Sequence, residues 1–124
     1  MGEDADLCGV RCQDLEKVRA TQERLLDGAE AARTASLFRL LGDPTRVRML
    51  FALLEAGELC VCDLAATVEV PESNVSQNLR LLRAAGVVRN RRAGRMVIYS
   101  LDDAHVRLLL DLSRAHLAHP GPGV

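Results

Sequence analysis

The sequence has 124 residues, with 16 basic and 17 acidic side chains and only three aromatic residues among 48% hydrophobic ones. A chain of this length forms one modest hydrophobic core, which excludes catalytic barrels and most two-domain enzymes. No apolar stretch approaches the ~20 residues that span a bilayer, and the amino terminus lacks the basic-then-apolar pattern of a secretion signal. We therefore expect a cytoplasmic protein with no membrane partner.

The charges are segregated along the chain, although their sum is only -1. Residues 1–72 carry eight basic and fourteen acidic side chains, whereas residues 73–100 carry six basic side chains and no acid. The six are Arg80, Arg83, Arg89, Arg91, Arg92 and Arg95. Because clustered positive charge attracts phosphate, this block predicts a nucleic-acid surface that the net charge hides.

The first half of the chain reads as an arm followed by helices. Residues 1–13 hold two cysteines and little apolar sequence, so we expect a flexible arm. Helical spacing predicts helices over about 14–28 and 30–41. Asp43 as N-cap, followed by Pro44, introduces a further helix that ends at Gly57. Its expected core positions are Val47, Leu50, Phe51 and Leu54.

The second half changes from helical to alternating spacing. A short helix is predicted from Cys60 to about Val68, and a helix over about 72–85 follows a break at Val70 and Pro71. Alternation after Gly86 predicts a β-hairpin with its tip at 92–95. A last helix, capped by Asp102, is expected to run to about 119, before a tail at 120–124.

Two short helices joined by a tight turn and followed by a basic hairpin are typical of a winged helix-turn-helix. The predicted fold is thus mainly α with a small β-hairpin, over residues 14–119. A helix of this kind enters the major groove of double-stranded DNA, whereas single strands require exposed aromatic side chains. The expected base-reading residues are Ser73, Asn74, Ser76 and Gln77, and the expected phosphate-binding residues are Arg80, Arg89, Arg91, Arg92 and Arg95. The alternative is a polar helix that simply faces water.

Four cysteines occur as two close pairs, Cys8 with Cys12 and Cys60 with Cys62. In a reducing compartment they are expected to be thiols that serve as soft metal ligands. Cys60 and Cys62 lie at the predicted start of a helix, whose N-terminus is expected to lower their pKa. A single cysteine is more often a small buried hydrophobe, but two pairs favour metal binding.

A second set of possible ligands lies on the last predicted helix. Asp103 and His105 stand near its start, and His116 and His119 near its end. Eleven residues of helix separate His105 from His116, about 16 Å, which is too far for one ion. Two antiparallel copies of this helix would bring the two ends together, which predicts a homodimer with shared sites. Oxygen and imidazole ligands suit zinc or cobalt better than cadmium or lead. Histidines near a helix end are otherwise ordinary surface residues.

Three segments together resemble the ArsR/SmtB family of metal-sensing repressors over about residues 30–119. They are ELCVCDLA at 58–65, SNVSQNLRLLRAAGVV at 73–88 and the arginine hairpin that ends in YSL at 99–101. The segment DLCGVRCQDLEKV at 6–18 extends the resemblance to the cadmium- and lead-sensing, CadC-like branch. Asn78 departs from the pattern, because the family usually has histidine there.

The resemblance implies a homodimer that binds its operator without metal and leaves it when metal binds. It implies a thiolate site for a cadmium or lead ion, made by Cys60 and Cys62 together with Cys8 and Cys12 from the arm of the other subunit. It also implies a zinc ion at Asp103, His105, His116 and His119.

Other functions remain open at this point. Arsenic sensors also carry ELCVCD, so arsenite or antimonite is an alternative signal, and thiol oxidation is another. A metal-buffering protein would not explain the basic block. A thiol redox enzyme is disfavoured because the spacer between Cys60 and Cys62 is one residue rather than two. We therefore expect neither an enzyme nor a small organic substrate.

Overall fold

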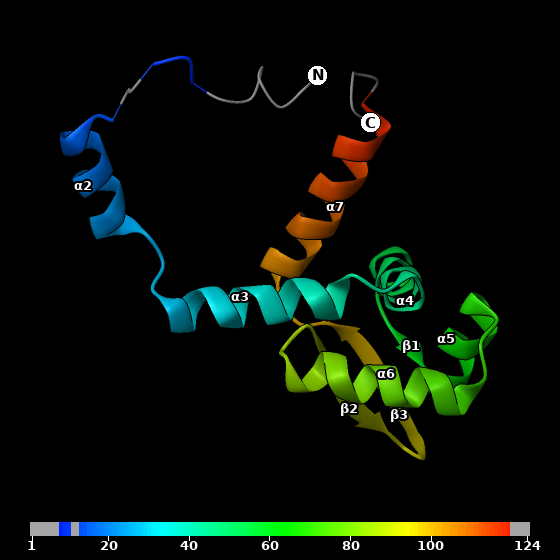
Figure 1. The fold of residues 1–124 in the computed structure, drawn as a ribbon. Helices are drawn as coiled ribbons and strands as arrows, with labels where there is room; N and C mark the ends of the chain where they lie inside the picture. Colours follow the sequence, from blue (N-terminus) through cyan, green and yellow to red (C-terminus); the bar gives the residue numbers. More distant parts are fainter. Residues whose placement is uncertain (1–7, 11–12, 120–124) are drawn as a thin grey trace. The chain divides into compact units, whose positions relative to one another are not determined.

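The computed structural model describes residues 8–10 and 13–119, and the chain divides into two units, 1–34 and 35–124 (Figure 1). Most of the expected arm, including Cys12, and the expected tail at 120–124 lie outside the described residues. Among the residues that are described, no helix combines the length and apolar content needed to cross a membrane.

The first unit contains helix α2 (Leu15–Arg24) and the start of helix α3 (Gly28–Leu41). The Asp27 carboxylate accepts the Glu30 N–H at 2.8 Å, and the Glu30 carboxylate accepts the Asp27 N–H at 3.1 Å. This reciprocal capping box fixes the start of α3. It explains why α3 begins two residues sooner than the sequence pattern predicts. Helix α2 ends at Arg24, earlier than predicted, because the backbone of Leu25 is already extended, with φ -72° and ψ 148°.

The second unit holds the remaining elements. They are α4 (Pro44–Ala56), β1 (Leu59–Cys60), α5 (Val61–Val68), α6 (Glu72–Ala84), β2 (Val88–Ala93), β3 (Met96–Leu101) and α7 (Ala104–Ala118). The Asp43 carboxylate accepts the Arg46 N–H at 3.0 Å and Gly57 takes a φ of 85° at the other end of α4, so both predicted ends of this helix are confirmed.

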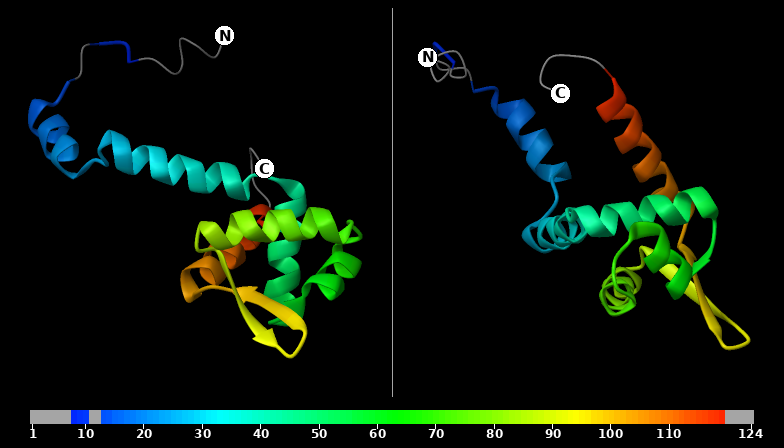
Figure 2. Two further views of the ribbon diagram at one scale, coloured as in Figure 1. Left: turned by 90° about the horizontal axis from the view of Figure 1, so that it is seen from below. Right: turned by 90° about the vertical axis from the view of Figure 1, so that its right-hand side faces the viewer.

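The sheet has three antiparallel strands in the order β1-β3-β2, one more than the predicted hairpin. Cys60 is therefore the last residue of a strand, opposite Ile98, and not the first residue of a helix as expected. The turn of the hairpin is also tighter than predicted, because Ala93 pairs with Met96 and only Gly94 and Arg95 lie between the strands. Gly94 has a φ of 63°, as two-residue hairpin turns require. The β2–β3 hairpin projects from the helices of this unit (Figure 2).

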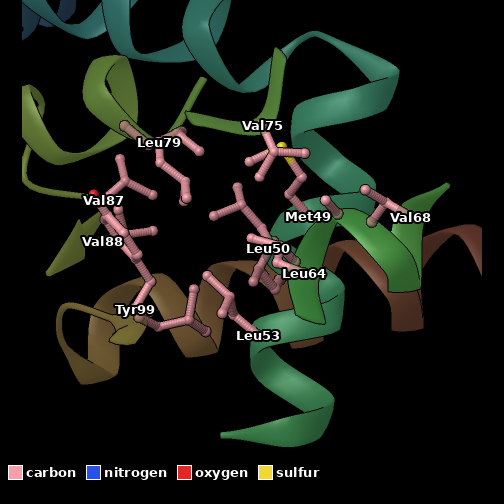
Figure 3. Close-up of a cluster of buried hydrophobic side chains, with 14 residues drawn as sticks. Met49, Leu50, Leu53, Leu64, Val68, Val75, Leu79, Val87, Val88 and Tyr99 are labelled. Atoms are coloured by element: carbon pink, nitrogen blue, oxygen red, sulfur yellow. The ribbon is translucent and has the colours of Figure 1, made fainter. Parts of the chain in front are cut away.

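One hydrophobic core joins α4, α5, α6 and the sheet (Figure 3). Val75, Leu79 and Leu82 of α6 are fully buried, as predicted. On α4 the buried face is centred on Met49, Leu50 and Leu53, whereas three of the four expected core residues are only half-buried. The reason is that α4 packs against α5 and β3 on that face and leaves its other apolar side on a groove beside α3 and α7.

Candidate nucleic-acid interface and metal ligands

Helix α6 presents a polar face opposite its buried stripe. Ser73, Asn74, Gln77 and Arg80 are exposed, and Ser76 is half-buried. The preceding helix α5 ends at Val68 and is followed by its C-cap Glu69, which has a left-handed φ of 59°, and Pro71 then leads into α6. This tight turn and the stripe of Val75, Leu79 and Leu82 hold α6 with its polar residues toward solvent, as a helix that enters the major groove requires.

The arginines of the hairpin do not form one surface. Side chains alternate along a strand, so Arg89 and Arg91 of β2 share one face and Arg92 lies on the other. Arg95 lies in the two-residue turn at the hairpin tip. All four are exposed. The hairpin therefore offers charge on two faces and at its tip.

Arg91 already has an acidic partner in the folded chain. Its Nε and Nη2 atoms donate to the two carboxylate oxygens of Glu58 at 2.9 and 3.0 Å. The hydrogen bond from Arg91 holds the pKa of Glu58 below its usual value, with the charges of Arg91 and Arg89 acting in the same direction, and Glu58 in turn raises the pKa of Arg91. The basic block is free of acids in the sequence, but the fold brings Glu58 into it.

A second group of polar residues connects α4 with α6. Arg46 donates from Nη1 to Oδ1 of Asn78 at 3.0 Å, and from Nε to the carbonyl of Leu40 at 2.6 Å. Asn78 donates from Nδ2 to Oδ1 of Asn74 at 2.7 Å. The sequence pattern did not predict that these three side chains are connected. The spacing of four residues between Asn74 and Asn78 was the available signal, because such residues are neighbours on a helix.

Cys60 and Cys62 lie on either side of the junction between β1 and α5. Cys60 is half-buried and Cys62 is exposed. The pKa of Cys62 is raised, first by the charge of Cys60 and its hydrogen bond with Cys60, and then by the acidic residues Glu72 and Asp63. The expectation that the helix N-terminus lowers the pKa of both thiols is therefore wrong for Cys62, whose pKa is raised by Cys60 and by the neighbouring acidic residues. Two adjacent thiols suit a soft cation, which offsets the repulsion between two thiolates.

The arm contributes one described cysteine. Cys8 is exposed and belongs to the first unit, whereas Cys12 lies outside the described residues. Within residues 8–10 and 13–119, no three or more His, Cys, Asp or Glu side chains gather so as to hold a metal ion in a single chain.

Asp103, and not the expected Asp102, caps helix α7. Its Oδ1 accepts the N–H of Val106 at 3.1 Å, because the helix begins one residue later than the pattern predicts. This hydrogen bond lowers the pKa of Asp103, and the neighbouring His105 lowers it further. The other oxygen, Oδ2, is 3.6 Å from Nδ1 of His105. The structure thus brings Asp103 and His105 together at the start of α7.

His116 and His119 lie at the other end of α7. His116 is in the last turn, and the N–H of His119 at the C-cap donates to the carbonyl of His116 at 3.3 Å. Both are exposed. The exposed Leu108 and Leu112 lie between them and His105. At spacings of three and four residues, one face of α7 carries His105, Leu108, Leu112, His116 and His119.

Comparison with known proteins agrees with this arrangement of helices and wing. Residues 43–90 match the family described as bacterial regulatory proteins of the arsR family. The chain is 44% identical over 115 residues to a transcriptional repressor SmtB homolog from Synechocystis sp., covering 93% of this chain and 86% of that protein. It is 37% identical over 111 residues to a cadmium resistance transcriptional regulatory protein CadC homolog from Staphylococcus aureus, covering 90% and 91%.

The crystal structure of the AntR antimony-specific transcriptional repressor has a similar fold, with a TM-score of 0.68 and 36% sequence identity, covering 76% of this chain and 85% of that one. These relatives are transcriptional regulators and not enzymes. The winged helix-turn-helix with a CxC motif at the joint of wing and helix, together with this degree of identity, shows that the chain belongs to the ArsR/SmtB family of transcriptional repressors.

Proposed function

We propose that this protein is a metal-responsive repressor that binds double-stranded operator DNA as a metal-free homodimer and is released by a soft heavy-metal ion. The polar face of α6 reads bases in the major groove. Phosphates are bound by arginines of α6 and of the hairpin other than Arg91, which is held by Glu58. Cadmium or lead is the proposed signal at the cysteines, and zinc is the proposed ion at the Asp and His residues of α7.

The observation that carries this proposal is the position of the CxC motif between the two DNA-contacting parts. Cys60 pairs with Ile98 in the middle strand of the wing, and Cys62 lies in the first turn of α5. Helix α5 packs directly against the recognition helix α6. Ligation of both thiols by one ion therefore changes the geometry at the joint of β1 and α5, the helix that packs against the recognition helix.

The cysteines of the arm complete the proposed thiolate site. We assign Cys8 and Cys12 to the site formed by Cys60 and Cys62 of the other subunit. This assignment rests on the resemblance of the arm to the CadC-like branch. A link of this kind between subunits alters the spacing of the two recognition helices, on which binding of a dimer to two half-sites depends. A coupling of about 3 kcal/mol weakens operator affinity about a hundredfold, and DNA weakens metal binding by the same factor.

The exposed stripe on α7 supports the proposed dimer and its zinc sites. Leu108 and Leu112 are 56% and 58% exposed, although both are large apolar residues. Leu112 is seven residues from both His105 and His119. If two copies of α7 pack antiparallel, with the two-fold axis passing between their Leu112 side chains, His105 of one copy lies opposite His119 of the other. Leu108 of one copy then lies opposite His116 of the other. The apolar centre of the stripe is buried, and the ligands gather at its two ends.

Arsenite or antimonite is the second candidate signal. It is favoured by the ELCVCD motif and by the likeness to AntR, whose description names antimony. Trivalent arsenic and antimony, like cadmium and lead, prefer thiolate ligands. A response to thiol oxidation at Cys60 and Cys62 would use the same joint, and it differs by requiring an oxidant and no metal.

The test is a titration of cadmium, lead, zinc and arsenite into the purified protein bound to a fluorescent fragment of its own promoter. DNA release is followed by anisotropy, and thiolate ligation is followed by ultraviolet charge-transfer absorption. We expect cadmium or lead to release DNA together with the rise of absorption. Release of DNA by arsenite alone would mean that arsenite, and not cadmium or lead, is the signal. Release of DNA by peroxide without metal would indicate a sensor of thiol oxidation. Failure to bind any promoter fragment would favour a metal-buffering protein.

Two sets of variants separate the sites. If cadmium still released DNA normally from Cys60→Ser/Cys62→Ser, the thiolate switch would be contradicted. Normal release of DNA from Cys8→Ser/Cys12→Ser would likewise contradict the role of the arm. His116→Ala is the matched change at the other site. It is expected to lower the zinc stoichiometry and to leave the thiolate absorption of the cadmium complex unchanged, and unaltered zinc binding would contradict the shared site on α7.

A further inference from the structure

In the hydrogen-bonded group of Arg46, Asn78 and Asn74, the arginine determines which atoms donate and which accept. A guanidinium group only donates hydrogen bonds. The atom of Asn78 that faces Nη1 of Arg46, at 3.0 Å, must therefore be the amide oxygen Oδ1. Arg46 is itself held by the carbonyl of Leu40 at the end of α3, and its backbone N–H donates to the cap residue Asp43. The orientation of the Asn78 amide follows from this anchored arginine.

The amide nitrogen of Asn78 consequently faces Asn74. It donates to the backbone carbonyl of Asn74 at 3.1 Å and to the side-chain Oδ1 of Asn74 at 2.7 Å. An amide nitrogen has two hydrogens, so these two acceptors use both of them. Asn74 must then turn its own oxygen toward Asn78, because its NH₂ group would face another donor in that position.

Within the part of the chain that the structure describes, the two amide N–H groups of Asn74 have no acceptor, and Asn74 lies on the exposed face of α6. It is the third residue of this helix, and the first residues of a recognition helix are the ones that reach base edges. We propose that Asn78 is a positioning residue that makes Asn74 a donor, so that Asn74 selects guanine at one position of each operator half-site. This inference rests on the proposed binding of operator DNA.

The chemistry of the major groove gives the preference for guanine. Guanine offers two acceptors there, N7 and O6, whereas adenine offers one acceptor and one donor. An asparagine that reads adenine uses its oxygen for N6 and its nitrogen for N7. In this chain the oxygen of Asn74 is directed to Asn78, so the pairing with adenine is disfavoured and guanine is expected to be preferred by about tenfold or more.

The test is selection of bound sequences from a random DNA library by the metal-free, full-length protein. Asn74→Ala identifies the position that this side chain reads, because preference is lost there and is retained elsewhere. Asn78→Asp keeps the size of the side chain and the oxygen that accepts from Arg46. It replaces the amide nitrogen that donates to Asn74 by a carboxylate oxygen, which only accepts. Asn74 then turns its NH₂ inward and its oxygen outward, and the preference at that one position is expected to change from guanine to adenine or cytosine.

A purely structural role of Asn78 would lower affinity for all sequences and leave the preferred base unchanged. Guanine retained in Asn78→Asp, adenine preferred by the unaltered protein, or no position affected by Asn74→Ala would each overturn the inference while operator binding stands. If Asn78→Asp does not fold, as judged by circular dichroism, Asn78→Ala takes its place and must narrow the discrimination between guanine and adenine. Absence of any selected sequence with the unaltered protein would overturn the proposed DNA binding, and this inference with it.

Discussion

Replacement of Glu58 by glutamine removes the acid that the fold places within the basic block. In the folded chain both Nε and Nη2 of Arg91 donate to Glu58, so this guanidinium presents little of its charge to DNA. A glutamine keeps the size of the side chain but loses the negative charge. We expect Arg91 in Glu58→Gln to bind a phosphate that it does not reach in the unaltered protein.

The magnitude follows from counterion release. Each additional phosphate contact steepens the logarithmic dependence of DNA affinity on salt by about 0.9, which gives about 1.8 for the two hairpins of a dimer. Over a fourfold rise in salt, from about 50 to 200 mM, the variant is expected to lose about tenfold more affinity than the unaltered protein. At the low-salt end it is expected to bind more tightly.

The assay is anisotropy of a labelled promoter fragment at a series of salt concentrations. Glu55→Gln is the matched control, because it removes the same charge from an exposed position on α4 that, among the described residues, has no ion pair with an arginine. Its salt dependence is expected to equal that of the unaltered protein. Adding Arg91→Ala to Glu58→Gln is expected to abolish the steeper slope. Equal slopes for Glu58→Gln and the unaltered protein would refute the reasoning, because they would mean that Arg91 leaves Glu58 whenever DNA binds.

Three further predictions concern stability and assembly. Leu79 is fully buried in the stripe of α6, so Leu79→Ala is expected to lower the free energy of unfolding, measured by urea denaturation, by about 2–5 kcal/mol. Leu81 is exposed, so Leu81→Ala is expected to lower it by less than about 0.5 kcal/mol. Equal losses for the two variants would contradict the packing of α6. Asp43→Ala is expected to cost about 1 kcal/mol by loss of the α4 cap, and Asp43→Asn much less. Leu112→Glu places two like charges at the centre of the proposed helix pair, so analytical ultracentrifugation is expected to show a monomer, while Asp111→Asn remains dimeric.

Regular local patterns accounted for most of the fold. The spacing of Val75, Leu79 and Leu82 predicted the buried side of α6, and Asp43 with Gly57 predicted both ends of α4. Errors occurred where neighbouring residues offered equivalent signals. Asp102 and Asp103 are adjacent possible caps, and only the closed turn shows that Asp103 accepts the N–H of Val106. A two-residue strand such as β1 has too little sequence for alternation to appear.

The sequence by itself determined the winged helix-turn-helix, the polar face of α6, the two cysteine pairs and the histidines of the last helix. These features depend on periods of two and 3.6 residues and on short motifs, which are properties of neighbouring residues. Only the tertiary structure decided that Glu58 binds Arg91 and that Arg46 orients Asn78, because these partners are 33 and 32 residues apart. Such pairs form only when the core brings distant segments together, so no local pattern records them.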